Sequence, residues 1–232
     1  MRLLTNLLCC SAVLVMLSPS FAAEDPKPNP DWPNLNAYRA ANAQVQPVKK
    51  GVQRVVFMGD SITEFWSKNQ WDTAYINRGI SGQTSPQMLL RFRQDVIDLH
   101  PRVVVILAGT NDVAGNTGPA TNAMISNNIA SMVQLAQANG SRVVLASVLP
   151  ASSFYWNPEA RPAQQIMELN QELQSLAKRY RCVYLDYFSP MVDEQQGLKK
   201  AYSDDGVHPN EAGYVVMKQL VKQAIARASQ AR

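Results

Sequence analysis

Apolar and polar residues follow two repeating patterns along the chain. Short runs of apolar, often β-branched residues predict five strands, at 54–58, 74–77, 103–108, 143–148 and 183–187. Segments with helical spacing lie around them, at 35–45, 86–99, 122–139, 163–180 and 211–228. Continuous apolar strands that alternate with helices are typical of a parallel sheet covered on both faces. The pattern therefore predicts an α/β protein, a three-layer α/β/α sandwich of about five parallel strands.

The first residues have the layout of a secretory signal peptide. Arg2 precedes an apolar stretch, and the small residues Ser20 and Ala22 fit a cleavage site. Two alternatives are an uncleaved membrane anchor, for which the apolar run is short, and a lipid anchor on Cys9 or Cys10, which bulky residues precede. We expect a signal peptide at 1–22, an N-terminal extension at 23–47 and one folded domain at 48–232. The expected location is periplasmic or secreted.

Composition and charge exclude some classes of binding partner. Of 232 residues, 46% are hydrophobic and 17% are charged, which is typical of a soluble domain with a full core. The net charge of +4 is mild, and Lys and Arg form no dense cluster with interleaved aromatic residues, so we expect no nucleic-acid partner. After removal of residues 1–22, no stretch predicts stable membrane association. Cys182 is then the last cysteine, so no intrachain disulfide can form, and we expect it to be a buried apolar residue. The oligomeric state is open.

In open parallel sheets, ligands bind beyond the carboxyl ends of the strands, and polar residues gather at these points of the sequence. The first strand is followed by Gly59, Asp60 and Ser61 and then by a helical segment. A serine at such a turn has an exposed hydroxyl and an N–H at a helix N-terminus, which suits a nucleophile. The alternative is that Asp60 or Ser61 caps the helix, with Glu64 completing a capping box.

The next two strands end in loops that can supply hydrogen-bond donors. Gly82 lies in a glycine-rich loop before the helix that contains Pro86, where backbone N–H groups can point inward. Asn111 follows the third strand and offers a side-chain amide; its alternative role is an Asx-type turn.

The last polar group is a loop before the final helix that contains Asp204, Asp205 and His208. A serine hydroxyl needs a base to accept its proton, and histidine is the usual base near neutral pH. The chain has one other histidine, His100, which falls at the opposite end of the sheet. The Asp-x-x-His spacing favours Asp205 over Asp204 as the carboxylate that orients His208.

Four motifs in the same order resemble those of the SGNH hydrolases, also called GDSL esterases/lipases. They are the Gly59-Asp60-Ser61 triplet, Gly82, the Gly109-Thr110-Asn111-Asp112 block and the Asp205-Gly206-Val207-His208-Pro209 block. The resemblance covers roughly residues 55–221 and implies a flavodoxin-like fold. It implies Ser61 as nucleophile, His208 as base and Asp205 as its acid. It also implies an oxyanion hole formed by the Ser61 N–H, the Gly82 N–H and the Asn111 side chain. Asp60 and Asp112 are expected to brace loops.

These residues predict an ester hydrolase that works through an acyl group on Ser61. We expect neither a metal nor a cofactor, because no second metal ligand accompanies His208 and no phosphate loop follows the first strand. The expected substrate is a short acyl ester, such as an acetyl ester, of a carbohydrate or small alcohol. Two roles are possible for Phe154, Tyr155 and Trp156. They contact the substrate, by stacking on a sugar or lining an acyl pocket, or they pack their own loop against the domain. The same two roles are possible for Trp66 and Trp71. The alternatives are a thioesterase or lysophospholipase with the same triad, and a non-catalytic carbohydrate-binding domain.

Overall fold

The computed structural model describes residues 30–49, 51–66 and 75–230. Asp31–Arg232 form one compact unit. The predicted signal peptide lies outside the described residues, as do Trp71 and Ala74, the first residue of the second predicted strand. In the part of the chain that is described, no helix has both the length and the apolar character needed to cross a membrane.

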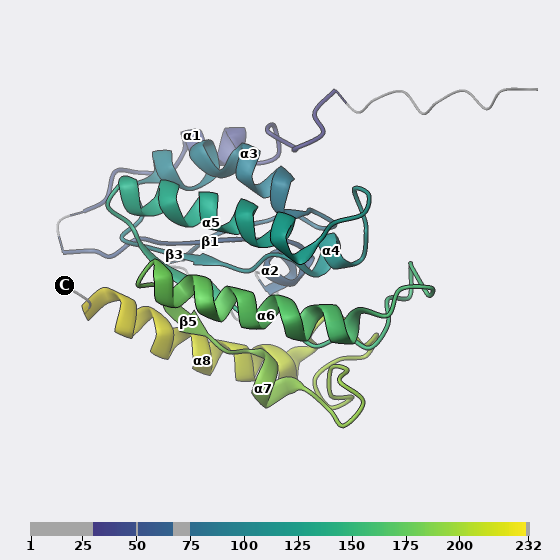
Figure 1. Ribbon diagram of the computed structural model, residues 1–232. Helices are drawn as coiled ribbons and strands as arrows, with labels where there is room; N and C mark the ends of the chain where they lie inside the picture. Colours follow the sequence, from purple (N-terminus) through teal and green to yellow (C-terminus); the bar gives the residue numbers. More distant parts are fainter. Residues whose placement is uncertain (1–29, 50, 67–74, 231–232) are drawn as a thin grey trace, which may run out of the picture. The chain divides into compact units, whose positions relative to one another are not determined.

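Five parallel strands form the centre of this unit, in the spatial order β2-β1-β3-β4-β5. Figure 1 labels β1, β3 and β5 of this sheet between the helices. They are β1 (Val55–Gly59), β2 (Tyr75–Gly79), β3 (Val103–Ile106), β4 (Arg142–Ala146) and β5 (Val183–Leu185). Residues of β1 and β3 are buried throughout, because helices cover both faces of the sheet. The predicted parallel sheet is therefore confirmed, with strand bounds that differ from the prediction by at most two residues.

Two helical layers enclose two apolar cores. One core joins the sheet to α3 (Ser85–Asp95), α5 (Asn122–Ala138) and α6 (Pro162–Arg179), which Figure 1 shows lying side by side. The other core joins the sheet to α2 (Ser61–Trp66), α7 (Phe188–Met191) and α8 (Glu211–Gln230). This arrangement confirms the three-layer α/β/α sandwich. Trp66 is buried in the second core, so its role is packing.

Three helical segments differ from the sequence-based expectation. The helix expected at 35–45 is shortened to α1 (Arg39–Ala43), which buries no residue. The helix expected at 86–99 ends at Asp95, because Val96 leaves the helical conformation (φ −128°). A 3₁₀ turn, Ile97–Leu99, follows and ends at exposed His100 (φ 51°). A short helix, α4 (Thr110–Val113), replaces the loop expected around Asn111.

The segment before β1 is attached to the rest of the compact unit by hydrogen bonds. The Tyr38 hydroxyl donates to the Gly79 carbonyl at the end of β2. The Asn42 amide donates to Asp95 Oδ1 over 2.7 Å, and the Gln87 amide donates to the Trp32 carbonyl over 2.7 Å. The compact unit therefore begins at Asp31, within the range that the sequence assigns to an N-terminal extension.

Candidate active site

A tight turn between β1 and α2 places Ser61 at the carboxyl end of the sheet. A Cβ on Gly59 would lie 2.0 Å from Thr63 Oγ1, so only glycine lets α2 turn back this closely on the strand. Ser61 is the first residue of α2 and is 8% exposed. Asp60 Oδ1 accepts the Ile62 N–H over 3.0 Å, so the capping role considered for Asp60 is present.

His208 lies between Ser61 and Asp205. Its Nε2 lies 2.9 Å from Ser61 Oγ, and its Nδ1 lies 2.7 Å from Asp205 Oδ2. A carboxylate only accepts hydrogen bonds, so Nδ1 carries the proton and Nε2 is left to accept the Ser61 hydroxyl. The three side chains that the sequence predicts as a triad are thus brought together in one hydrogen-bonded chain.

Hydrogen bonds keep Asp205 ionised and hold its loop. Desolvation opposes ionisation, but bonds from the His208 ring, the His208 N–H and the Val207 N–H lower the pKa of Asp205 below its usual value. The Ser203 hydroxyl donates to the His208 carbonyl over 2.7 Å and accepts the Gly206 N–H over 2.9 Å. Sequence reasoning did not single out Ser203. Asp204 accepts the Asn210 amide over 3.4 Å, away from His208.

The three residues that the family resemblance implies as oxyanion donors, Ser61, Gly82 and Asn111, line one pocket. The Ser61 N–H belongs to the first turn of α2 and has no acceptor within that helix. Gly82 adopts φ +76°, a conformation that favours glycine, and its N–H finds no acceptor among the described residues. Asn111 is 4% exposed, and its amide donates one hydrogen to the Gln83 carbonyl over 3.1 Å. The second hydrogen of that amide finds no acceptor among the described residues.

A buried ion pair contacts two of the segments that carry these donors. Arg91 is fully buried and lies 3.1 Å from Asp95 Oδ2. Its Nη2 donates to the Gly59 carbonyl over 3.0 Å, and its Nε donates to Gln83 Oε1. One guanidinium thus joins the end of β1 to the loop that follows β2. The sequence gives no signal for this pair, because an (i, i+4) Arg–Asp spacing on a helix is usually an exposed contact.

Two further buried carboxyl groups lie next to the site. Burial raises the pKa of Asp60 to about 7, against the lowering effects of the Ile62 N–H and of His208, while Asp112 adds to the rise. Asp60 Oδ2 is buried without a hydrogen-bond partner among the described residues. Asp112 accepts the Ser85 N–H and hydroxyl, the latter over 2.5 Å, and so links α4 to the start of α3. Asp112 therefore braces two loops, as expected.

An open pocket of about 390 Å³ lies over the triad. Tyr155 and Trp156 form part of its wall, with exposed fractions of 66% and 37%. Phe154 is fully buried and stacks on Trp156 with ring centroids 4.9 Å apart. Both roles considered for this aromatic segment are therefore present: Phe154 packs the loop against the core, whereas Tyr155 and Trp156 face the pocket. Phe65 also lines the pocket, with its ring centroid 5.4 Å from that of His208.

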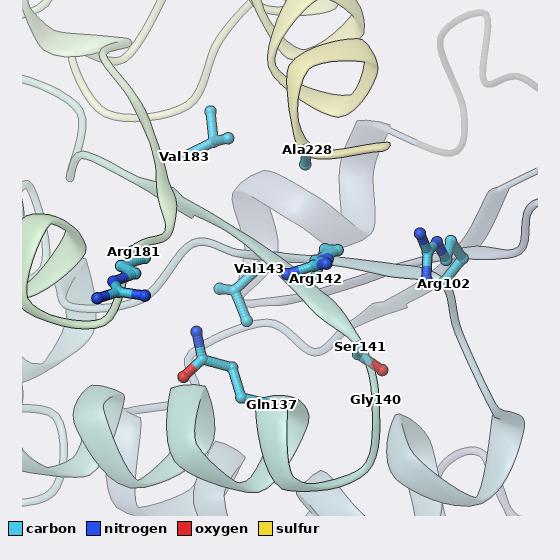
Figure 2. Close-up of a pocket in the computed structure, with 9 residues that line it drawn as sticks. All are labelled: Arg102, Gln137, Gly140, Ser141, Arg142, Val143, Arg181, Val183 and Ala228. Carbon is cyan, nitrogen blue, oxygen red and sulfur yellow. The ribbon is translucent and has the colours of Figure 1, made fainter. Parts of the chain in front are cut away.

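A second pocket, of about 320 Å³, lies at the amino-terminal end of the strands (Figure 2). Its lining side chains include three arginines but no pair of nucleophile and base: Arg102, Gln137, Gly140, Ser141, Arg142, Val143, Arg181, Val183 and Ala228. Among the described residues, no three His, Cys, Asp or Glu side chains gather as metal ligands would. Cys182 packs against the core, where desolvation raises the pKa of its thiol to about 12 and keeps it un-ionised.

Comparison with known proteins places this site in a family. Residues 57–216 match the model of the GDSL-like Lipase/Acylhydrolase family, which is more than half of the chain. The chain belongs to this family. The match confirms the resemblance drawn from the four motifs, and with it the general class of carboxylic ester hydrolases.

Solved structures and a curated esterase agree with this placement. The crystal structure of a GDSL-like lipase from Bacteroides thetaiotaomicron VPI-5482 is 48% identical, covering 84% of this chain and 98% of that one, with a TM-score of 0.82. A structure from Bacteroides fragilis NCTC 9343 is 46% identical, covering 87% and 100%, with a TM-score of 0.84. Esterase TesA of Pseudomonas aeruginosa is 31% identical over 140 residues, which span 60% of this chain and 63% of that protein.

Proposed function

We propose that this GDSL-family protein is a serine hydrolase that transfers an acyl group from an ester to Ser61 and then to water. The observation that carries the proposal is the chain of two hydrogen bonds from Ser61 Oγ through His208 to Asp205 Oδ2, of 2.9 and 2.7 Å. Nucleophile, base and orienting carboxylate lie within the distances that such a triad requires.

In the first half of the reaction, Ser61 Oγ attacks the ester carbonyl carbon while His208 Nε2 accepts the hydroxyl proton. The negative charge on the carbonyl oxygen is stabilised by the Ser61 N–H, the Gly82 N–H and the free hydrogen of the Asn111 amide. His208 then gives its proton to the leaving alcohol oxygen as the C–O bond breaks. In the second half, His208 Nε2 accepts a proton from a water molecule as the water oxygen attacks the acyl carbon. The bond between that carbon and Ser61 Oγ then breaks, His208 returns the proton to Ser61 Oγ, and the acid is released. Asp205 stabilises the imidazolium in both halves.

The pocket supports a short acyl group on a carbohydrate or another small alcohol. Its described lining contains aromatic and polar side chains but no aliphatic one that would form a channel for a long acyl chain. The exposed rings of Tyr155 and Trp156 meet edge to face, with centroids 4.7 Å apart, and offer apolar surfaces that suit the faces of a sugar ring. We therefore propose acetyl esters of sugars or small alcohols as the substrate class.

A single substrate panel separates this proposal from its alternatives. Purified mature protein is assayed with p-nitrophenyl esters of increasing acyl length, acetylated sugars, acyl-thioesters and lysolipids. The proposal predicts the highest kcat/KM for acetyl esters and a steep fall with chain length. A maximum on long-chain thioesters or lysolipids would instead indicate a thioesterase or a lysophospholipase. Binding of sugars without hydrolysis of any ester would indicate a carbohydrate-binding domain.

We further propose that the protein acts in the periplasm or outside the cell, after cleavage at residue 22. The basis is the charged, apolar and small-residue pattern of the first residues. Expression of the full chain in a bacterial host, followed by N-terminal sequencing of the exported protein, tests this. A mature protein that begins at Ala23 is expected; an intact N-terminus in the cytoplasm would contradict the proposal.

A further inference from the structure

One exposed side chain contacts both residues that are proposed to complete the oxyanion hole beside Ser61. Asn116 lies just after α4, and its Nδ2 lies 2.9 Å from Asn111 Oδ1 and 3.2 Å from the Gly82 carbonyl oxygen. Its Oδ1 accepts the indole N–H of Trp156 over 3.0 Å. The Asn116 amide therefore joins the turn after α4, the loop after β2 and the aromatic loop, which is the loop that contains residues 154–157. Both its NH₂ group and its oxygen are hydrogen-bonded.

The direction of this hydrogen-bond chain is set at one end by Trp156. An indole N–H is only a donor, so the part of the Asn116 amide that faces it must be the oxygen. The Asn116 NH₂ group then faces the Gly82 carbonyl and Asn111 Oδ1. With its oxygen occupied in this way, Asn111 must direct its own NH₂ group toward the Gln83 carbonyl and the pocket. A reversed Asn111 amide would place an acceptor where the oxyanion forms.

We propose that Asn116 is a positioning residue for the oxyanion hole and that the Trp156 N–H fixes its orientation. This inference rests on the proposed function, since it takes Asn111 and Gly82 as oxyanion donors. Oxyanion donors stabilise a transition state to the extent that they are already oriented before charge develops. Asn116 supplies this orientation without touching the reacting atoms. It also links the oxyanion hole to the loop whose rings face the substrate.

Asn116→Asp tests the proposal with a nearly isosteric change. The carboxylate keeps an acceptor for Trp156 but directs an oxygen at Asn111 Oδ1 and the Gly82 carbonyl, so it favours the reversed Asn111 amide. With p-nitrophenyl acetate, kcat should fall about 10–100-fold. Losses of this size are typical when a residue that only orients another functional side chain, such as the partner of a metal-binding histidine, is removed. KM should stay near its wild-type value, because the affected interaction strengthens only in the transition state.

Two further variants keep the test decisive should the carboxylate disturb the fold. Asn116→Ala removes the donor without adding charge, and Trp156→Phe keeps the ring but removes its N–H. Both should lower kcat, the second by less, with unchanged KM for p-nitrophenyl acetate. Asn157→Asp is the matched control, because Asn157 lies in the aromatic loop but donates to the Ala114 carbonyl over 2.9 Å. Its kcat should stay near that of the wild type, and circular dichroism should be native for all four.

A double-mutant cycle with Asn111→Ala identifies the route of the effect. If Asn116 acts through Asn111, Asn116→Asp should cost much less kcat in the Asn111→Ala background than in the wild type. Equal costs in both backgrounds, or wild-type kcat in folded Asn116→Asp, would overturn the inference while the triad and Asn111 keep their proposed roles. If Asn111→Ala itself keeps wild-type kcat, the proposed oxyanion hole fails, and the inference about Asn116 fails with it.

Discussion

The hydroxyl of Ser61 lies 2.9 Å from Nε2 of His208, although 147 residues separate them in the sequence. The fold brings them together because α2 and α8 cover the same face of the sheet. Ser61 is the first residue of α2, and His208 lies in the loop just before α8. The Tyr214 hydroxyl of α8 donates to the Ile62 carbonyl of α2 over 2.8 Å and fixes the two helix starts side by side. The geometry on which the proposed chemistry depends therefore follows from the packing of two helices.

The first prediction distinguishes Asp205 from its neighbour. Asp205→Asn permits the wrong tautomer of His208, so kcat should fall by about 10⁴ while the fold is kept. Asp204→Asn is the matched control, since Asp204 contacts Asn210 and not the imidazole, and it should cost far less. Steady-state kinetics on an acetyl ester measure both. A larger loss for Asp204→Asn would show that the two carboxylates have been assigned in the wrong order.

The second prediction concerns the oxyanion hole. Asn111→Ala removes a donor from a buried site, so kcat should fall roughly 10²–10³-fold, about 2.7–4 kcal/mol, with little change in KM. The free hydrogen of the Asn111 amide is the group at issue, because the other one is held by the Gln83 carbonyl. A raised KM with wild-type kcat would mean that Asn111 binds the ground state of the substrate instead.

The site was predictable from the sequence where it depends on strand ends. Ser61, Gly82 and Asn111 each follow an apolar run, and the carboxyl ends of parallel strands meet at one edge of the sheet. The contacts between loops were not predictable, because they depend on how irregular segments fold over that edge. Asn116 and Trp156 are 40 residues apart and follow no periodicity, so only the folded chain shows that they are bonded. The same holds for Glu64, which accepts the Ser81 N–H over 2.7 Å.

Helix bounds were likewise predictable only where a helix buries an apolar face. The long helix α6 has a strong apolar periodicity, and its bounds differ from the prediction by one residue at each end. α1 buries no residue and is held by side-chain hydrogen bonds to α3, which leave no periodic signal. Arg91 is charged, and charged residues in a helix usually mark its solvent-exposed face, so the sequence pattern does not predict that Arg91 is buried against Asp95.

A third prediction concerns stability. Arg91→Leu removes the cation that lies 3.1 Å from the buried Asp95 carboxylate, and it also removes a donor from the Gly59 carbonyl. The free energy of unfolding should fall by about 3–5 kcal/mol, measured by urea denaturation. Arg93→Leu, an exposed position on the same helix, is the control and should change it little. Equal small effects of the two variants would show that the buried ion pair does not stabilise the fold.

A fourth prediction uses the buried carboxyl next to Ser61. Desolvation raises the pKa of Asp60 to about 7, above its value in the unfolded chain, so the folded state binds one more proton between these two pKa values. The stabilising contribution is complete below the unfolded-state pKa and is lost as pH rises through about 7. The free energy of unfolding of the wild type should therefore fall between pH 5 and pH 8 by more than that of Asp60→Asn, which cannot titrate.

Urea denaturation of both proteins at the two pH values measures this difference. Asp98→Asn, at an exposed position, is the control and should follow the wild-type pH dependence. If Asp60→Asn and the wild type lose the same free energy between pH 5 and pH 8, Asp60 is ionised throughout that range in the folded protein.

The most direct test of the central claim is to identify the residue that a fluorophosphonate modifies. Such a reagent forms a covalent bond with a serine that is activated by a base and surrounded by oxyanion donors. Mass spectrometry of the digested wild-type protein should find the phosphonyl group on Ser61, and Ser61→Ala and His208→Ala should remain unlabelled with native circular dichroism. Labelling of a different serine, or undiminished ester hydrolysis by Ser61→Ala, would contradict the account.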